Sequence, residues 1–127
     1  MRDFSGKTAV ITGAGSGMGR YLAVLLAKAG ANVAICDVNE ESLNDTAKMV
    51  KEYNVGLSTH VVDMGDMDQI ETLPDAVLSQ HGAVDLVFNN AGVTMGSTFS
   101  GMSEEDWDWV MNINLNGVVK ALSLIQI

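Results

Sequence analysis

Four short apolar runs, rich in β-branched residues, alternate along the chain with longer segments whose apolar residues recur at helical spacing. The runs are predicted as strands and the longer segments as helices. Strands joined by helices form a parallel sheet through right-handed crossovers, with helices on both faces. The alternation therefore predicts a single α/β domain over residues 1–127, a doubly wound parallel sheet of about four strands with flanking helices. The predicted strands are residues 7–12, 32–37, 57–63 and 84–90.

Helices are expected in the intervening segments. The third, over 66–80, contains Pro74, which removes one backbone hydrogen bond and predicts a kink or a late helix start. Ser103 is predicted to cap a helix that runs to about Met111, and a further helix is expected over 113–127. The apolar positions at helical spacing in the first helix are Met18, Tyr21, Leu22, Leu25, Leu26 and Ala29.

The fourth run, 84–90, has a continuous apolar centre, which predicts burial on both faces. Without a fifth strand, its outer edge is expected to be open and prone to pair with another chain. The last helix carries Val118, Ala121, Leu122 and Ile125 on one side, a stripe suited to packing. Because the sequence stops inside this helical pattern, we expect a truncated chain rather than a complete short domain.

Charge and composition exclude several classes of protein. The formal net charge is −9, with 16 Asp and Glu against 7 Lys and Arg. We expect no nucleic-acid partner, because phosphate binding depends on clustered cations. We also expect no membrane span, because no apolar stretch approaches the length of about 20 residues that a span needs. The single cysteine, Cys36, and the absence of a signal-peptide core predict a cytoplasmic location.

A glycine-rich segment, TGAGSGMGR, directly follows the first predicted strand. Gly13 permits a tight turn, Gly17 lets the backbone approach a pyrophosphate, and Gly19 lets the helix pack closely on the sheet. The start of the helix then offers unpaired N–H groups to phosphates. Asp37 ends the next strand, where a carboxylate binds the adenosine ribose. The segment predicts a dinucleotide site; the alternative is that its glycines only form a turn.

Asp37 also bears on the choice of cofactor. A carboxylate accepts hydrogen bonds from the ribose hydroxyls but repels a 2′-phosphate, so NAD is expected and NADP is less favoured. Ser16 is neutral, and Arg20 is the nearby cation that could hold a 2′-phosphate. The alternative role for Asp37 is that of a helix-capping carboxylate.

Two motifs together carry a resemblance to a known family. The pattern T-G-x-x-x-G-x-G at 12–19, with NNAG at 89–92, resembles the short-chain dehydrogenase/reductase family. The segment 106–118 is similar to a family segment with a helix-kinking asparagine, which matches Asn114 best. The resemblance covers the entire chain and implies a Rossmann-type fold that binds a dinucleotide.

The resemblance also implies roles for single residues. Thr12 and the NNAG motif would tie strand ends together, the N–H of Met18 would bind a phosphate, and Asp63 would meet the adenine amino group. Asp63 could instead cap a strand end, and Asn90 could brace a turn. The expected cofactor-binding set is Gly13, Ser16, Gly17, Met18, Gly19, Asp37, Asp63, Asn89, Asn90, Ala91 and Gly92.

Most of the family's catalytic groups are absent from these residues. The family uses a serine, a Tyr-x-x-x-Lys motif and an asparagine, but Tyr21 and Tyr53 are each followed four residues later by leucine. Asn114 is the one matching catalytic position, and without the lysine we expect it to bond locally within a kinked helix. Because the family's corresponding helix often lies at a subunit interface, a homo-oligomer through the last helix is expected.

Two functions follow from these features. The first is the cofactor-binding half of an oxidoreductase that transfers a hydride between NAD(H) and an alcohol or ketone, inactive as this chain alone. The alternative is a non-catalytic dinucleotide-binding or interaction module. No metal site is expected, because His60 and His81 are distant in sequence and lack further ligands at a recognised spacing. Trp107 and Trp109 are expected at the core and its rim.

Overall fold

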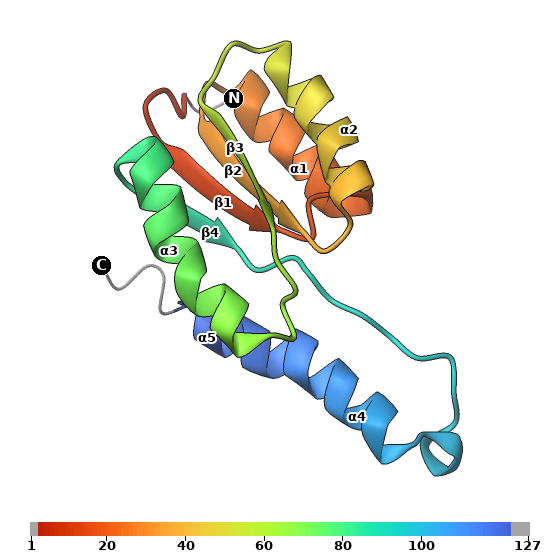
Figure 1. Cartoon of the computed structure of the whole chain (residues 1–127). Coiled ribbons are helices and arrows are strands. Elements are labelled where there is room, and N and C mark those ends of the chain that lie inside the picture. The colour runs from red at the N-terminus through yellow and green to blue at the C-terminus, as the bar shows by residue number, and fades with distance from the viewer. Residues whose placement is uncertain (1–2, 123–127) are drawn as a thin grey trace.

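The computed structural model describes residues 3–122, whose arrangement is shown in Figure 1. Four parallel strands form one sheet in the order β3-β2-β1-β4, which confirms the predicted α/β fold. The strands are β1 (Thr8–Thr12), β2 (Asn32–Asp37), β3 (Leu57–Val61) and β4 (Leu86–Phe88). The helices are α1 (Gly17–Lys28), α2 (Glu40–Lys51), α3 (Met67–His81), α4 (Glu104–Met111) and α5 (Val118–Leu122), with a 3-10 turn, η1 (Phe99–Gly101), and a π-helical segment, η2 (Asn112–Gly117).

The sheet is covered on both faces, and alternate strand residues supply two cores. Helices α1 and α2 pack on one face, and α3 and α5 pack on the other (Figure 1). Ile11 and Ile35 contribute to the first core, whereas Val10, Ala34 and Cys36 contribute to the second. This division follows from the two-residue period of a strand, which turns successive side chains to opposite faces.

The strand β4 differs most from its prediction. It comprises three half-buried residues, Leu86–Phe88, rather than a strand over 84–90 that is buried on both faces. Within residues 3–122, β4 pairs with β1 alone, in a register that places Val87 beside Val10. The prediction of burial on both faces is wrong because an apolar run shows what a strand can bury and not what covers it. The other three strands agree with their predictions to within two residues.

Two expectations about helices are also corrected. Met18 and Tyr21 are 82% and 67% exposed, so they lie outside the buried stripe of α1. That stripe consists of the smaller residues Gly19, Ala23, Leu26 and Ala27. Pro74 lies inside a continuous α3 that starts at Met67, directly after its N-cap Asp66, so the late helix start is wrong. Asp66 stabilises this start because its side chain accepts bonds from two N–H groups of the first turn.

The segment after β4 ends in one continuous helical run. Ser103 caps α4 as predicted, and α4 passes through the π-helical η2 into α5 without a break. Figure 1 shows α4 extending away from the sheet. Trp107 and Trp109 lie on α4 and are 49% and 44% exposed, so neither is a core residue. The predicted helix beyond Leu122, with Ile125, lies outside the described residues. Over residues 3–122, no helix combines the length and apolarity that crossing a membrane requires.

Candidate functional site

The carboxyl ends of β1, β2 and β4 meet at one edge of the sheet, where the chain forms a cleft. In doubly wound sheets, ligands bind at this edge, outside the carboxyl ends of the strands. The volume of the cleft is about 370 Å³. Its lining comprises Gly13, Ser16, Gly17, Met18, Asp37, Val38, Val62, Met64, Asn90, Ala91, Gly92, Val93 and Ile113. The lining thus brings together the glycine turn, Asp37 and the last three residues of the NNAG motif, which are far apart in the sequence.

Two glycines allow the turn after β1 to lie against the neighbouring backbone. Gly13 has a φ of +64°, and a Cβ added there would lie 2.8 Å from the Cα of Ala91. A Cβ at Gly19 would lie 2.2 Å from the carbonyl oxygen of Gly13 and 2.6 Å from Nδ2 of Asn90. No side chain fits at either position. The expected tight turn at Gly13 and close packing of the helix at Gly19 are therefore confirmed.

Thr12 ties the end of β1 to the NNAG motif, as the resemblance implied. Its Oγ1 accepts hydrogen bonds from the N–H groups of Asn90 and Ala91, at 3.1 and 3.0 Å. The side-chain amide of Asn90 donates in return to the carbonyl oxygens of Thr12 and Gly13, at 3.0 and 3.2 Å. Asn90 therefore braces the turn directly, and the two motifs hold each other in place.

The start of α1 faces the cleft with unpaired donors. The first bond of the helix runs from the N–H of Arg20 to the carbonyl oxygen of Ser16, at 3.1 Å. The N–H groups of Gly17, Met18 and Gly19 precede it and have no partner within the helix. Ser16 has an extended backbone, and its side chain makes no capping bond. The N–H groups and the positive end of the helix dipole are suited to an anionic group such as a phosphate.

Asp37 lies at the end of β2 and lines the cleft. Its Oδ2 accepts a hydrogen bond from the N–H of Gly15 at 2.8 Å, and its Oδ1 accepts one from the N–H of Asn39 at 2.9 Å. A carboxylate offers about four acceptor positions, so the two bonds leave capacity for a ligand's hydroxyl groups. A Cβ at Gly15 would lie 2.8 Å from this carboxylate. Gly15, which lies between Gly13 and Gly17, was not among the residues predicted for the site.

Arg20 lies beneath the glycine turn and is bound to protein groups. Its Nε donates to Oγ1 of Thr46 at 2.9 Å, and its Nη2 donates to the carbonyl oxygens of Gly15 and Ser42. Thr46 is fully buried and itself donates to the carbonyl oxygen of Ala14 at 2.8 Å. The guanidinium thus links the turn to α2 and is not among the residues that line the cleft.

Three predicted residues, Gly19, Asp63 and Asn89, do not line the cleft. Oδ1 of Asp63 accepts a hydrogen bond from the N–H of Gly65 at 2.7 Å. This bond fits the alternative role, in which the carboxylate caps the end of a strand. Its neighbours Val62 and Met64 line the cleft instead, a pair that the alternation of side chains along an extended segment could have indicated. Oδ1 of Asn89 is buried and has no hydrogen-bond partner within the described part of the chain.

Asn114 reaches across to the segment that follows the NNAG motif. Its Oδ1 accepts from the N–H of Val93 and its Nδ2 donates to the carbonyl oxygen of Val93, both at 2.8 Å. Asn114 lies in the π-helical segment η2, but the expected bonding of its side chain within the helix is wrong. Within η2, Nδ2 of Asn116 donates a hydrogen bond to Oδ1 of Asn112 at 2.9 Å. Asn114 instead pairs with a backbone unit as a neighbouring strand would, and so holds one wall of the cleft.

The chain matches known proteins over most of its length. The family described as short chain dehydrogenase matches residues 7–126. The 3-oxoacyl-[acyl-carrier-protein] reductase FabG of Thermotoga maritima is 36% identical over 120 residues, which are 94% of this chain and 49% of the reductase. The chain thus spans about half the length of this curated relative.

Solved structures match the fold equally well. A short chain dehydrogenase/reductase from Burkholderia phymatum in complex with NAD is 37% identical with a TM-score of 0.93, covering 99% of this chain and 45% of that one. A metagenomic short-chain oxidoreductase in complex with NADP is 30% identical with a TM-score of 0.90, covering 96% of this chain and 56% of that one. With the family match over residues 7–126, the chain belongs to the short-chain dehydrogenase/reductase family.

Proposed function

We propose that this chain is the cofactor-binding half of an oxidoreductase that transfers a hydride between NAD(H) and an alcohol or ketone. The observation that carries the proposal is the cleft, in which the open start of α1, the glycine turn and the Asp37 carboxylate face one volume. These groups fit the parts of a dinucleotide: donors for the phosphates, an acceptor for a ribose and an apolar pair, Val62 and Met64, for the adenine.

Different residues of the cleft bind different parts of the dinucleotide. The N–H groups at the start of α1 hold the pyrophosphate, and Asp37 accepts from the adenosine ribose. Ala91 and Gly92 border the nicotinamide ribose, on a backbone that Thr12 and Asn114 fix in place. When bound, the dinucleotide supplies or takes up the hydride. The protein must still polarise the carbonyl and move a proton, and a serine and a Tyr-x-x-x-Lys motif serve that purpose in the family.

We propose that these catalytic groups belong to a further part of a longer parent protein, because the chain spans about half of its curated relative. On this proposal the 127-residue chain binds NAD but reduces none of it in the presence of alcohols. The intact mass of the natural protein tests this proposal directly: about twice 13.5 kDa is expected. A natural mass of 13.5 kDa would favour the second candidate, a non-catalytic dinucleotide-binding or interaction module.

The preference for NAD is tested by calorimetric titration of the chain with NAD and NADP. Asp37 repels a 2′-phosphate, and the bonds of Arg20 to Thr46 and to the backbone make it a poor counter-ion, so NAD is expected to bind about tenfold more tightly or better. Asp37→Asn keeps the size and one acceptor while removing the charge, so the preference should fall to within about threefold. Asp45→Ala removes an exposed carboxylate of α2 and should leave the preference unchanged. An unchanged preference in Asp37→Asn would refute the assigned role.

We also propose that the parent protein forms a homo-oligomer through the last helix of this chain. The described part of the last helix packs on α3, where Ala121 is fully buried and Lys120 lies 3.6 Å from Glu71. A homo-oligomer would therefore use the outward side of this helix, with Leu122 48% exposed. Light scattering of the parent protein measures the assembly. A cytoplasmic location stays an expectation from the cysteine content.

A further inference from the structure

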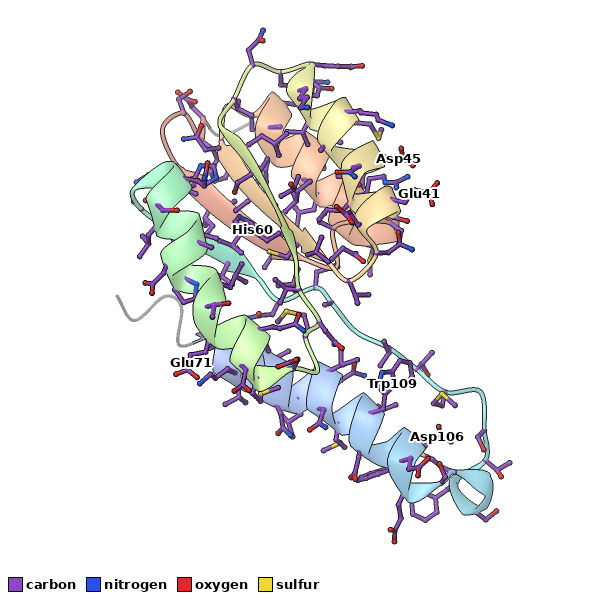
Figure 2. All side chains as sticks on the ribbon, in the orientation of Figure 1. Glu41, Asp45, His60, Glu71, Asp106 and Trp109 are labelled. Carbon is purple, nitrogen blue, oxygen red and sulfur yellow. The ribbon has the colours of Figure 1, made fainter. Side chains whose placement is uncertain are left out.

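Two histidines that are distant in sequence meet at one serine hydroxyl. Nε2 of His60 lies 2.7 Å from Oγ of Ser58, and Nε2 of His81 lies 2.8 Å from the same atom. Ser58 and His60 lie on the same face of β3, and His81 is the last residue of α3, which packs on that face. Figure 2 labels His60 on this strand. None of the three residues lines the cofactor cleft.

The geometry brings two nitrogen ligands to one point. The two distances set an upper limit of 5.5 Å on the separation of the Nε2 atoms. Two imidazole nitrogens on one tetrahedral Zn²⁺ lie about 3.4 Å apart, a difference that small side-chain rotations can cover. The hydroxyl of Ser58 can donate its hydrogen to one Nε2 atom, so the other Nε2 carries a hydrogen and donates it to Oγ. A shift of that Nε2 hydrogen to Nδ1 of the same ring makes the Nε2 lone pairs of both histidines available to a metal.

The surroundings favour a cation and leave room for its other ligands. His81 ends a helix of 15 residues, where the helix dipole is negative. A surface cavity of about 480 Å³, lined in part by Ser58, His60 and Gln80, lies beside His60 and has room for the waters that complete a coordination shell.

We propose that His60 and His81 form a binding site for a divalent transition-metal ion such as Zn²⁺, with Ser58 or water completing the coordination. The two histidines are distant in sequence, and they lie close together because α3 packs on the strand β3. Cys36 lies beside His60 in the register of β2 and β3. Its side chain is fully buried, and the proposed site does not include it.

The test is a calorimetric titration of the untagged 127-residue chain with Zn²⁺, and with Mg²⁺ as a cation that prefers oxygen ligands. One saturable Zn²⁺ site per chain and no saturable Mg²⁺ site are expected. His60→Gln and His81→Gln should each weaken Zn²⁺ binding at least about tenfold, because even the loss of an outer-shell partner costs roughly 10- to 100-fold. Circular dichroism confirms that each variant is folded.

Two control variants separate this pair from other ligands. Gln80→Ala alters the same cavity without touching an imidazole, and Cys36→Ala removes the neighbouring thiol; both should bind Zn²⁺ as the natural sequence does. The proposal is overturned if the chain shows no saturable Zn²⁺ site, if both histidine variants bind unchanged, or if Cys36→Ala loses binding. NAD titrations are independent of these outcomes, so failure here leaves the proposed function untouched.

Discussion

Two segments that follow strands at the same edge of the sheet are built in opposite ways. The turn after β1 is so close to its neighbours that a single added Cβ at Gly19 would overlap the backbone of Gly13. The segment after β4 is open: a Cβ at Gly96 would meet nothing within 4 Å, and Phe99 is 87% exposed. The first segment is therefore held in one conformation by close contacts, whereas the second is exposed and loosely packed.

The largest expected effect comes from placing a methyl group in each segment. Gly19→Ala forces the Cβ against backbone atoms that cannot move aside, so we expect a loss of about 3 kcal/mol or more in the free energy of unfolding. NAD binding should be lost with it. Gly96→Ala places the same methyl group in open space and should change stability by less than about 0.5 kcal/mol. Urea denaturation followed by circular dichroism measures both, and equal losses would contradict the contrast.

A second pair of variants removes a hydroxyl group from each segment. Thr12→Val leaves the N–H groups of Asn90 and Ala91 without their acceptor, so a loss of about 2 kcal/mol is expected, with weaker NAD binding. Thr98→Val removes an exposed hydroxyl and should cost less than about 0.5 kcal/mol. A Thr12→Val chain of unchanged stability would show that the two motifs are not held together by this hydroxyl.

The same contrast explains what the sequence could predict. The turn after β1 is determined locally, because glycine spacing, the preceding strand and the following helix all lie within twelve residues or so of one another. Its tight turn and its close packing were predicted from this spacing and are present. Its tie to the NNAG motif is also present, but it was expected from the family resemblance and not from local pattern. The role of Gly15, the bonds of Arg20 and the reach of Asn114 to Val93 depend on which elements become neighbours. Single-sequence patterns contain no such information.

The error at β4 and the unforeseen contact of the two histidines with one serine have the same cause. An apolar run predicted burial on both faces, but burial depends on the strands that lie beside it, and in residues 3–122 β4 has one neighbour. His60 and His81 were not expected to lie close together because they are distant in sequence, but the crossover through α3 brings both to Ser58. Periodicity predicts a helix or strand and the face that it buries, whereas contacts between elements are known only from the three-dimensional structure.

The strands β1 and β4 differ in burial in the same way as the segments that follow them. Val10 is 1% exposed at the centre of the sheet, and its register partner Val87 on β4 is half-buried. Val10→Ala should cost about 2 kcal/mol, because it removes two buried methyl groups and leaves a cavity. Val87→Ala should cost about 1 kcal/mol. Urea denaturation measures the difference; equal costs would mean that β4 is as well covered as β1.

The smallest expected effect concerns the other end of β4, where Asp85 joins it to β1. Its carboxylate accepts a bond from the N–H of Thr8 and one from Nζ of Lys7, each at 2.9 Å. The bond from Thr8, and after it the bond from Lys7, lowers the pKa of this carboxyl below its ordinary 3.8 in the folded state.

Because the folded state holds the carboxylate form, its contribution to stability is complete above the ordinary pKa and is lost as the pH falls through the lower folded value. Asp85→Asn should therefore be slightly less stable than the natural sequence at pH 7, and the two stabilities should converge as the pH falls below 3.8 and through the lower folded pKa. Lys7→Gln removes the weaker of the two partners and should show the same convergence with a smaller gap. Urea denaturation across pH 2.5 to 7 measures all three chains. A gap that persists at the lowest pH would mean that Asp85 fixes β4 to β1 by its shape and packing rather than by its charge.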